Sequence, residues 1–195
     1  MPRGQNFGEI TEAIGSAPVV ATRTEPFRRV AGALAERFRT CLPLWDLKAA
    51  AGAFGEGRAP EVEAWVEPDA KRRLGPGMFV AQVVGESMNR RIPNGAYGVF
   101  RRPVEGSRQG KVVLVQSRNI QDQDHGGEYT VKAYQSDKVP DGDGSWTHAE
   151  IRLLPDSTDA KYRPIILRGE PCRDLKVIAE LVEVLSGEGL NVAAP

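Results

Sequence analysis

The feature of this sequence that most constrains its fold is a series of short apolar runs, separated by turn-forming residues, that begins after Pro43. The runs at Met78–Val84 and Lys111–Ser117 have the length and composition of buried strands. Between residues 128 and 134, apolar and polar side chains alternate, as on a strand with two unlike faces. Because the connections are short, antiparallel pairing is favoured. The sequence therefore predicts a mostly β fold of short, largely antiparallel strands.

Turn chemistry indicates where the other strands begin and end. The stretches at 119–127 and 139–145 are rich in Gly and Asp, which is typical of hairpin loops. A long apolar-rich run at 175–185 predicts the last strand. Shorter strands are expected at 61–67, 97–101, 149–154 and 163–168.

The chain before Pro43 has a different pattern. Residues 1–24 show no clear periodicity and are typical of a mobile arm. After Thr24, a possible helix cap, apolar residues recur at helical spacing, namely Phe27, Val30, Ala31, Leu34 and Phe38. We therefore expect three parts: an N-terminal arm at 1–42 with one amphipathic helix at about 25–39, a β domain at 43–186, and a flexible tail at 187–195.

Charge and composition argue against several classes of function. The chain has 26 basic and 26 acidic residues, so no net positive field attracts nucleic acid or an acidic membrane surface. One helix is also too little for a helix-turn-helix, so direct DNA binding is not expected. No apolar stretch approaches the roughly 20 residues that span a bilayer, and no leader segment is visible. We expect a cytoplasmic protein with no membrane contact.

The two cysteines, Cys41 and Cys172, lie far apart and match no metal-ligand spacing. We expect them to be reduced thiols, and we expect neither a metal nor a cofactor.

The segment Gly85-Glu86-Ser87-Met88 is the strongest candidate for chemistry, because it follows an apolar strand directly. A glycine there permits a sharp turn, and a serine on that turn would present its hydroxyl beside backbone amides. Such amides can stabilise an oxyanion. A Gly-x-Ser sequence at the end of a strand is, however, also a common simple turn.

A serine nucleophile needs a base, and the sequence offers two kinds. His125 and His148 both fall in predicted loops or beside them, where histidines are usually solvated. Lys132 lies in a predicted strand among apolar and aromatic neighbours, where an unpaired lysine is unusual. Burial would favour its neutral amine, which is a base. On periodicity alone, Lys132 can equally be a solvent-facing lysine.

Several motifs together resemble the LexA/UmuD family of serine peptidases. They are Gly85-Glu86-Ser87-Met88, the turn Ile92-Pro93-Asn94-Gly95, the strand Tyr129-Thr130-Val131-Lys132, and the late pair 151–156 and 162–167, in the family's order. The resemblance covers roughly residues 43–185. It implies the family's peptidase fold, Ser87 as nucleophile and Lys132 as general base. It also implies an oxyanion hole from the backbone amides of Glu86 and Ser87, with Met88 filling the core beneath the turn.

Members of this family cut their own chain, and residues 47–54 resemble the segment that is cut. The implied scissile bond is Ala51–Gly52, whose small side chains would let an extended segment reach Ser87. Two departures from the family pattern are visible. The chain from Ser87 to Lys132 is longer than in short members, with the extra residues at 119–127, and the N-terminal part is too short for a winged helix-turn-helix. The architecture is therefore closer to UmuD than to LexA.

The resemblance implies a Ser-Lys peptidase that cleaves its own N-terminal segment as a switch in a stress or DNA-damage response. A protein partner could trigger the cut. We also expect a homodimer that forms through an exposed strand edge at 175–185 or its neighbours. Two alternatives remain at this point. The domain could cut another protein in trans, or it could be a LexA-like regulator or an interaction module that no longer cuts.

Overall fold

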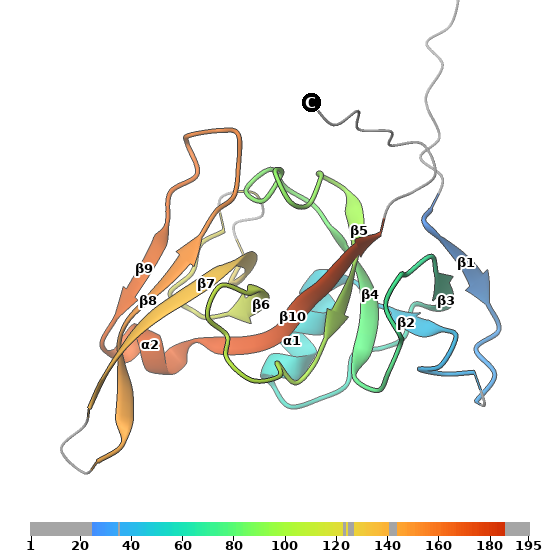
Figure 1. Cartoon of the computed structure of the whole chain (residues 1–195), viewed down its shortest axis with the longest axis horizontal. Coiled ribbons are helices and arrows are strands. Elements are labelled where there is room, and N and C mark those ends of the chain that lie inside the picture. The colour runs from blue at the N-terminus through green and yellow to red at the C-terminus, as the bar shows by residue number, and fades with distance from the viewer. Residues whose placement is uncertain (1–24, 35, 123, 125–126, 141–143, 186–195) are drawn as a thin grey trace, which may run out of the picture.

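The computed structural model describes residues 25–34, 36–122, 124, 127–140 and 144–185. These residues form one ten-stranded sheet in the order β1-β3-β2-β4-β5-β10-β6-β7-β8-β9, with two helices beside it (Figure 1). Every pair of neighbouring strands is antiparallel except β2 with β4. This confirms the predicted mostly β, largely antiparallel fold. The expected tail at 187–195 and the arm at 1–24 lie outside the described residues.

The elements have the following bounds. They are β1 Phe27–Val30, β2 Leu42–Leu44, α1 Leu47–Gly55, β3 Ala64–Pro68, β4 Met78–Val83, β5 Ala96–Arg101, β6 Val112–Gln116, β7 Tyr129–Pro140, β8 Trp146–Leu154, β9 Ile165–Arg168, α2 Glu170–Asp174 and β10 Lys176–Leu185.

Each apolar run that predicted a strand does form one, with ends shifted by a few residues. The main difference is the hairpin β7–β8, which extends well beyond the predicted strands and projects from the body of the molecule (Figure 1). Its outer part keeps the antiparallel pairing, with Lys138 opposite His148 and Pro140 opposite Trp146. The predicted loop at 139–145 is therefore shorter than expected, because β7 continues to Pro140.

The helix predicted at 25–39 is wrong: the described residues of this segment form strand β1 and turns. Gly32 explains where the extended segment ends, since its φ of 66° favours glycine and a Cβ there would lie 2.2 Å from the Trp65 ring. Phe27 packs edge-to-face on Tyr97, with ring centroids 4.8 Å apart. Pairing with β3 and this aromatic contact outweigh the helical spacing of the apolar residues.

The expected boundary at residue 43 falls inside a strand of the main sheet. Strand β2 lies between β3 and β4, and β1 pairs with β3, so residues 27–44 belong to the same sheet as the rest. Leu42 and Leu44 are buried with Val66 and Val80 in one apolar cluster. The sheet therefore continues across the expected boundary.

The last strand is not an edge. β10 pairs with β5 through its C-terminal half and with β6 through its N-terminal half, so it lies inside the sheet. The expectation that 175–185 offers a free edge for a homodimer is therefore wrong. In the described sheet, the outermost strands are β1 and β9. The homodimer itself stays a prediction.

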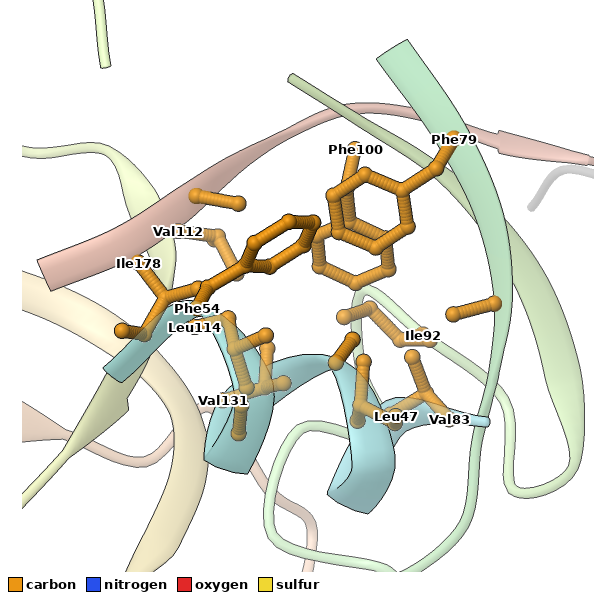
Figure 2. Close-up of a cluster of buried hydrophobic side chains, with 14 of the residues drawn as sticks. Leu47, Phe54, Phe79, Val83, Ile92, Phe100, Val112, Leu114, Val131 and Ile178 are labelled. Atoms are coloured by element: carbon orange, nitrogen blue, oxygen red, sulfur yellow. The ribbon is translucent and has the colours of Figure 1, made fainter. Parts of the chain in front are cut away.

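Helix α1 covers the centre of the sheet and builds the main core. Asp46 caps it, accepting a hydrogen bond of 2.8 Å from the amide of Ala49. From this helix, Leu47 and Phe54 reach the side chains of the strands, as Figure 2 shows. Phe79 stacks on Phe100 in the same cluster, with centroids 5.4 Å apart.

Two smaller observations complete the fold. Cys41 and Cys172 are buried free thiols. Within the described residues, no helix is long and apolar enough to cross a membrane.

The central aromatic cluster should dominate stability. Phe79 is fully buried, so Phe79→Ala should lower the free energy of unfolding by about 3–5 kcal/mol, through lost apolar contacts and the cavity left behind. Leu34 is 80% exposed, and Leu34→Ala should change it by less than about 0.5 kcal/mol. Urea denaturation of both variants checks this. Equal losses would show that the cluster is not the core of the folded state.

Candidate active site

Two residues that the sequence singled out meet in the structure. The Nζ atom of Lys132 donates a hydrogen bond of 2.7 Å to the Oγ atom of Ser87, although 45 positions separate them in the chain. Ser87 lies on the turn after β4, and Lys132 lies on β7. Both side chains are buried, with Lys132 only 4% exposed. Lys132 is therefore not the solvent-facing strand lysine that its spacing alone permits.

The turn that carries Ser87 is held in shape by Gly85 and Asn94. Gly85 has a φ of 115°, and a Cβ there would lie 2.4 Å from the Asp124 carboxylate, so no larger residue fits. Its amide donates a hydrogen bond of 2.9 Å to the side chain of Asn94. Asn94 in turn donates to the carboxylate of Glu86, at 2.9 Å. The Asn-Gly turn of the sequence thus fixes the turn that bears the serine.

The late segment after β8 holds the other side of this turn. The amide of Asp156 donates to the carbonyl of Ser87 at 2.9 Å, and the amide of Arg90 donates to the carbonyl of Asp156 at 3.1 Å. Beneath the turn, Met88 is 2% exposed and belongs to the main core. The expectation for Met88 is confirmed.

The predicted oxyanion donors are the amides of Glu86 and Ser87. Within the described part of the chain, neither amide donates to a protein acceptor. They lie directly beside the Ser87 hydroxyl in sequence, at a turn that borders a cleft. This leaves them available to a carbonyl oxygen bound there.

Lys132 has three further partners besides Ser87. Its Nζ atom lies 2.6 Å from the Thr130 hydroxyl, 3.2 Å from the Val131 carbonyl and 3.4 Å from the Asp122 carboxylate. Burial lowers the pKa of Lys132 below its ordinary value, and the nearby Asp122 carboxylate opposes part of that shift. The neutral amine, which can accept a proton, is therefore reached at a lower pH than in an ordinary lysine.

Asp122 is the site residue that the sequence did not reveal. It lies in the segment 119–127, which looked like a plain loop insertion, yet its side chain is buried and accepts a hydrogen bond from Thr130. The loop folds back because the amide of Asp122 donates to the carbonyl of Gly127 at 3.1 Å. One feature of the sequence could have predicted such a residue. Thr130 and Lys132 lie on one strand face, and two hydrogen-bond donors buried together there need an acceptor.

The competing bases lie elsewhere or outside the described residues. His148 is on β8, opposite Lys138 near the far end of the hairpin, and it has no part in the Ser87 cleft. Position 125 is not among the described residues. The structure therefore brings Lys132, and not His148, to the serine.

The segment expected to be cut is helical. Ala51 and Gly52 lie within α1, where Ala51 is 1% exposed in the main core and the carbonyl of Gly52 accepts from the amide of Glu56 at 3.1 Å. A small cleft opens beside Ser87, and of residues 47–54 it is lined by Leu47 alone. The structure thus does not bring Ala51 and Gly52 into the cleft in this conformation.

No family model matches the chain, and no curated protein matches it either. Among the described residues, no group of three or more His, Cys, Asp or Glu side chains could hold a metal ion. The candidate site thus consists of a buried serine, a buried lysine with a lowered pKa, and an adjoining cleft.

The opposing effects on Lys132 can be separated by one substitution. Asp122→Asn removes the carboxylate that raises the pKa of Lys132 and leaves the burial that lowers it, so this pKa should fall further. NMR titration of the lysine ¹³Cε signals measures it. Asp137 pairs with Arg152 at the surface, so Asp137→Asn should leave the Lys132 titration unchanged. A Lys132 pKa that rises in Asp122→Asn would contradict the assignment of these effects.

Proposed function

We propose that the protein is a serine peptidase with a Ser87–Lys132 dyad, of the type that the sequence resembles. One observation carries the proposal: the 2.7 Å contact between the Ser87 hydroxyl and the amine of a lysine that is almost wholly removed from water. A lysine amine kept neutral by burial is a competent base for a serine hydroxyl. A small cleft borders Ser87, and it marks the side from which we expect a peptide segment to approach the pair.

The chemistry follows from this arrangement. The Ser87 Oγ atom attacks a peptide carbonyl carbon while its proton passes to the neutral Lys132 amine. The carbonyl oxygen, now negative, faces the amides of Glu86 and Ser87. When the C–N bond breaks, the Lys132 ammonium returns the proton to the leaving nitrogen. Water then attacks the acyl ester with Lys132 again as base, which releases the acid and restores Ser87.

Asp122 and Thr130 position the base. The Thr130 hydroxyl links Asp122 to Lys132: it donates a hydrogen bond to the Asp122 carboxylate and lies 2.6 Å from the Lys132 Nζ atom. These contacts hold the amine toward Ser87. During the reaction Lys132 becomes an ammonium in a site that excludes water. The Asp122 carboxylate at 3.4 Å offsets part of the cost of that buried charge.

The proposed substrate is the protein's own segment at Ala51–Gly52, cut as a switch in a stress or DNA-damage response. Since this bond lies in α1, the helix must first unwind and present an extended strand to the cleft. Tethering gives the opened segment a high effective concentration at Ser87. Cutting would therefore be slow at rest, and a protein partner that binds the opened segment would accelerate it by mass action.

The helical state of this bond also favours a second candidate function. With Ala51 buried in the main core, α1 has a structural role of its own, and the cleft could instead receive a segment of another protein in trans. The two candidates use the same dyad. They differ in whether the rate of cutting depends on protein concentration.

The dyad makes a direct prediction. Full-length protein incubated at rising pH should yield a fragment that begins at Gly52, because only the neutral form of Lys132 accepts the proton. The rate should rise with pH and level off above the lowered pKa of Lys132. Ser87→Ala and Lys132→Arg should give no fragment, since a guanidinium does not lose its proton in this range. Intact-mass spectrometry over time measures the fragment and its rate of formation in the wild type and in both variants.

Ser117 provides a matched control, because it is a second buried serine and is not among the residues to which Lys132 is hydrogen-bonded in the described structure. Ser117→Ala should cut like the wild type. A first-order rate that is independent of concentration supports cutting in cis. If the Ser87→Ala protein is cut when mixed with wild type, and the rate rises with concentration, the trans candidate holds instead. Cutting that survives in Lys132→Ala would contradict the dyad.

The helical substrate makes a separate prediction. Asp46→Ala removes the cap of α1, which costs a helix about 1 kcal/mol, so the opened state and the cutting rate should increase about fivefold. Asp46→Asn keeps a good cap and should cut at the wild-type rate. The rate of fragment formation at fixed pH measures this. An equal rate in all three proteins would show that opening of α1 does not limit the reaction.

A further inference from the structure

One carboxylate beside the dyad has no part in the proposed mechanism. Asp124 is exposed and lines the cleft beside Ser87, and within the described residues it forms no ion pair. Asp122, which also lines the cleft, is buried against Thr130 and Lys132. Among the described residues that line the cleft, none is basic. The cleft therefore presents a carboxylate to a segment that enters it, and this charge favours a cation.

The side chain of Asp124 is held close to the proposed nucleophile. One oxygen of its carboxylate accepts a hydrogen bond from the Tyr162 hydroxyl, and its amide donates to the Asp122 carboxylate at 2.9 Å. The other carboxylate oxygen lies against Gly85, where a Cβ would be 2.4 Å from it. Gly85 precedes Ser87 by two positions on the same turn. A charge held in place in this way loses little side-chain entropy when it forms an ion pair.

A cation that matches this carboxylate lies on the segment proposed to be cut. Lys48 is exposed in the first turn of α1, and it forms no ion pair in the part of the chain that the structure describes. It directly follows Leu47, the residue of α1 that already lines the cleft. When α1 unwinds while Leu47 keeps its place, Lys48 is therefore the next residue beside the cleft.

The spacing of the chain also suits the proposed cut. Lys48 precedes Ala51 by three positions, so in an extended segment their Cα atoms lie about 10 Å apart. Ser87 and Asp124 line one small cleft. The flexible four-carbon stem of Lys48 lets its ammonium approach Asp124 while Ala51 lies at the nucleophile.

We propose that Asp124 forms an ion pair with Lys48 when α1 opens. This pair places the Ala51–Gly52 bond at Ser87. The inference rests on the proposed function, and it names the feature of the substrate that the site recognises. Asp124 acts here as a specificity residue: it binds the segment, and the chemistry stays with Ser87 and Lys132.

The test measures the rate at which the full-length protein forms the fragment that begins at Gly52. It is run on the pH plateau, where loss of the Asp124 charge, which raises the pKa of Lys132, does not change the share of neutral base. Asp124→Asn and Lys48→Met should each slow the rate about threefold to fivefold, as expected for an exposed ion pair. The double variant should be no slower than the slower single variant, because no pair is left to break.

A charge exchange separates the pair from other effects of these positions. Lys48→Asp should slow cutting in the wild-type background and accelerate it in the Asp124→Lys background, where it restores the attraction. Both proteins in the second comparison carry Asp124→Lys, so its effects on Lys132 cancel. An acidic residue in the first turn of α1 stabilises the helix, so such an acceleration does not come from easier opening. The cycle with Asp124→Asn decides the question by itself if Asp124→Lys does not fold.

Asp137→Asn provides the matched control, because Asp137 pairs with Arg152 at the surface and does not line the cleft. It should show no coupling with Lys48→Met. The inference is overturned if the wild type forms the fragment but the effects of Asp124→Asn and Lys48→Met multiply, or if Lys48→Asp slows cutting in both backgrounds. A wild type that forms no fragment under any condition would overturn the proposed function, and this inference with it.

Discussion

A lysine amine that is removed from water needs partners, and the arrangement around Lys132 follows from how the chain supplies them. Its own strand provides the Thr130 hydroxyl and the Val131 carbonyl, a folded loop provides Asp122, and the turn after β4 provides Ser87. Those contributions require β4, β6 and β7 to be placed correctly by β10, which joins the two halves of the sheet. The order of strands is therefore what brings distant residues to one amine.

A second buried charge shows why Lys132 differs from a structural ion pair. Glu180 is as deeply buried, but it accepts from Lys111 at 2.6 Å and from Arg101 at 2.7 Å. Burial raises its pKa, and the hydrogen bonds from these two cations outweigh that effect and lower it. Glu180 therefore remains charged and fixed. Within the described residues Lys132 forms one ion pair, with Asp122 at 3.4 Å, and there burial outweighs the neighbouring carboxylates, so the pKa of Lys132 is lowered.

The sequence predicted the elements whose signal is local. The apolar runs became strands, and the alternation around Lys132 placed that residue on the correct strand. The contact with Ser87 rested on a resemblance, because no local pattern measures the distance between two strands. Asp122 was missed since loops rich in Gly and Asp are usually solvated, and only tertiary folding buries this one. The helix at 25–39 was wrong for a related reason: pairing with β3 decided its structure.

The position of β2 gives the proposed cut a consequence beyond a shorter chain. β2 precedes Ala51 and lies between β3 and β4, so a break at this bond would place it on the smaller fragment, together with β1. If that fragment dissociates, β4 loses its neighbour β2, and the apolar side chains of Val66 and Val80, which pack on β2, become exposed. An unpaired strand edge beside exposed apolar side chains can pair with a strand from another molecule. Cleavage would then permit strand exchange: β2 would occupy the position beside β4 before the cut, and a strand of another chain could take that position afterwards.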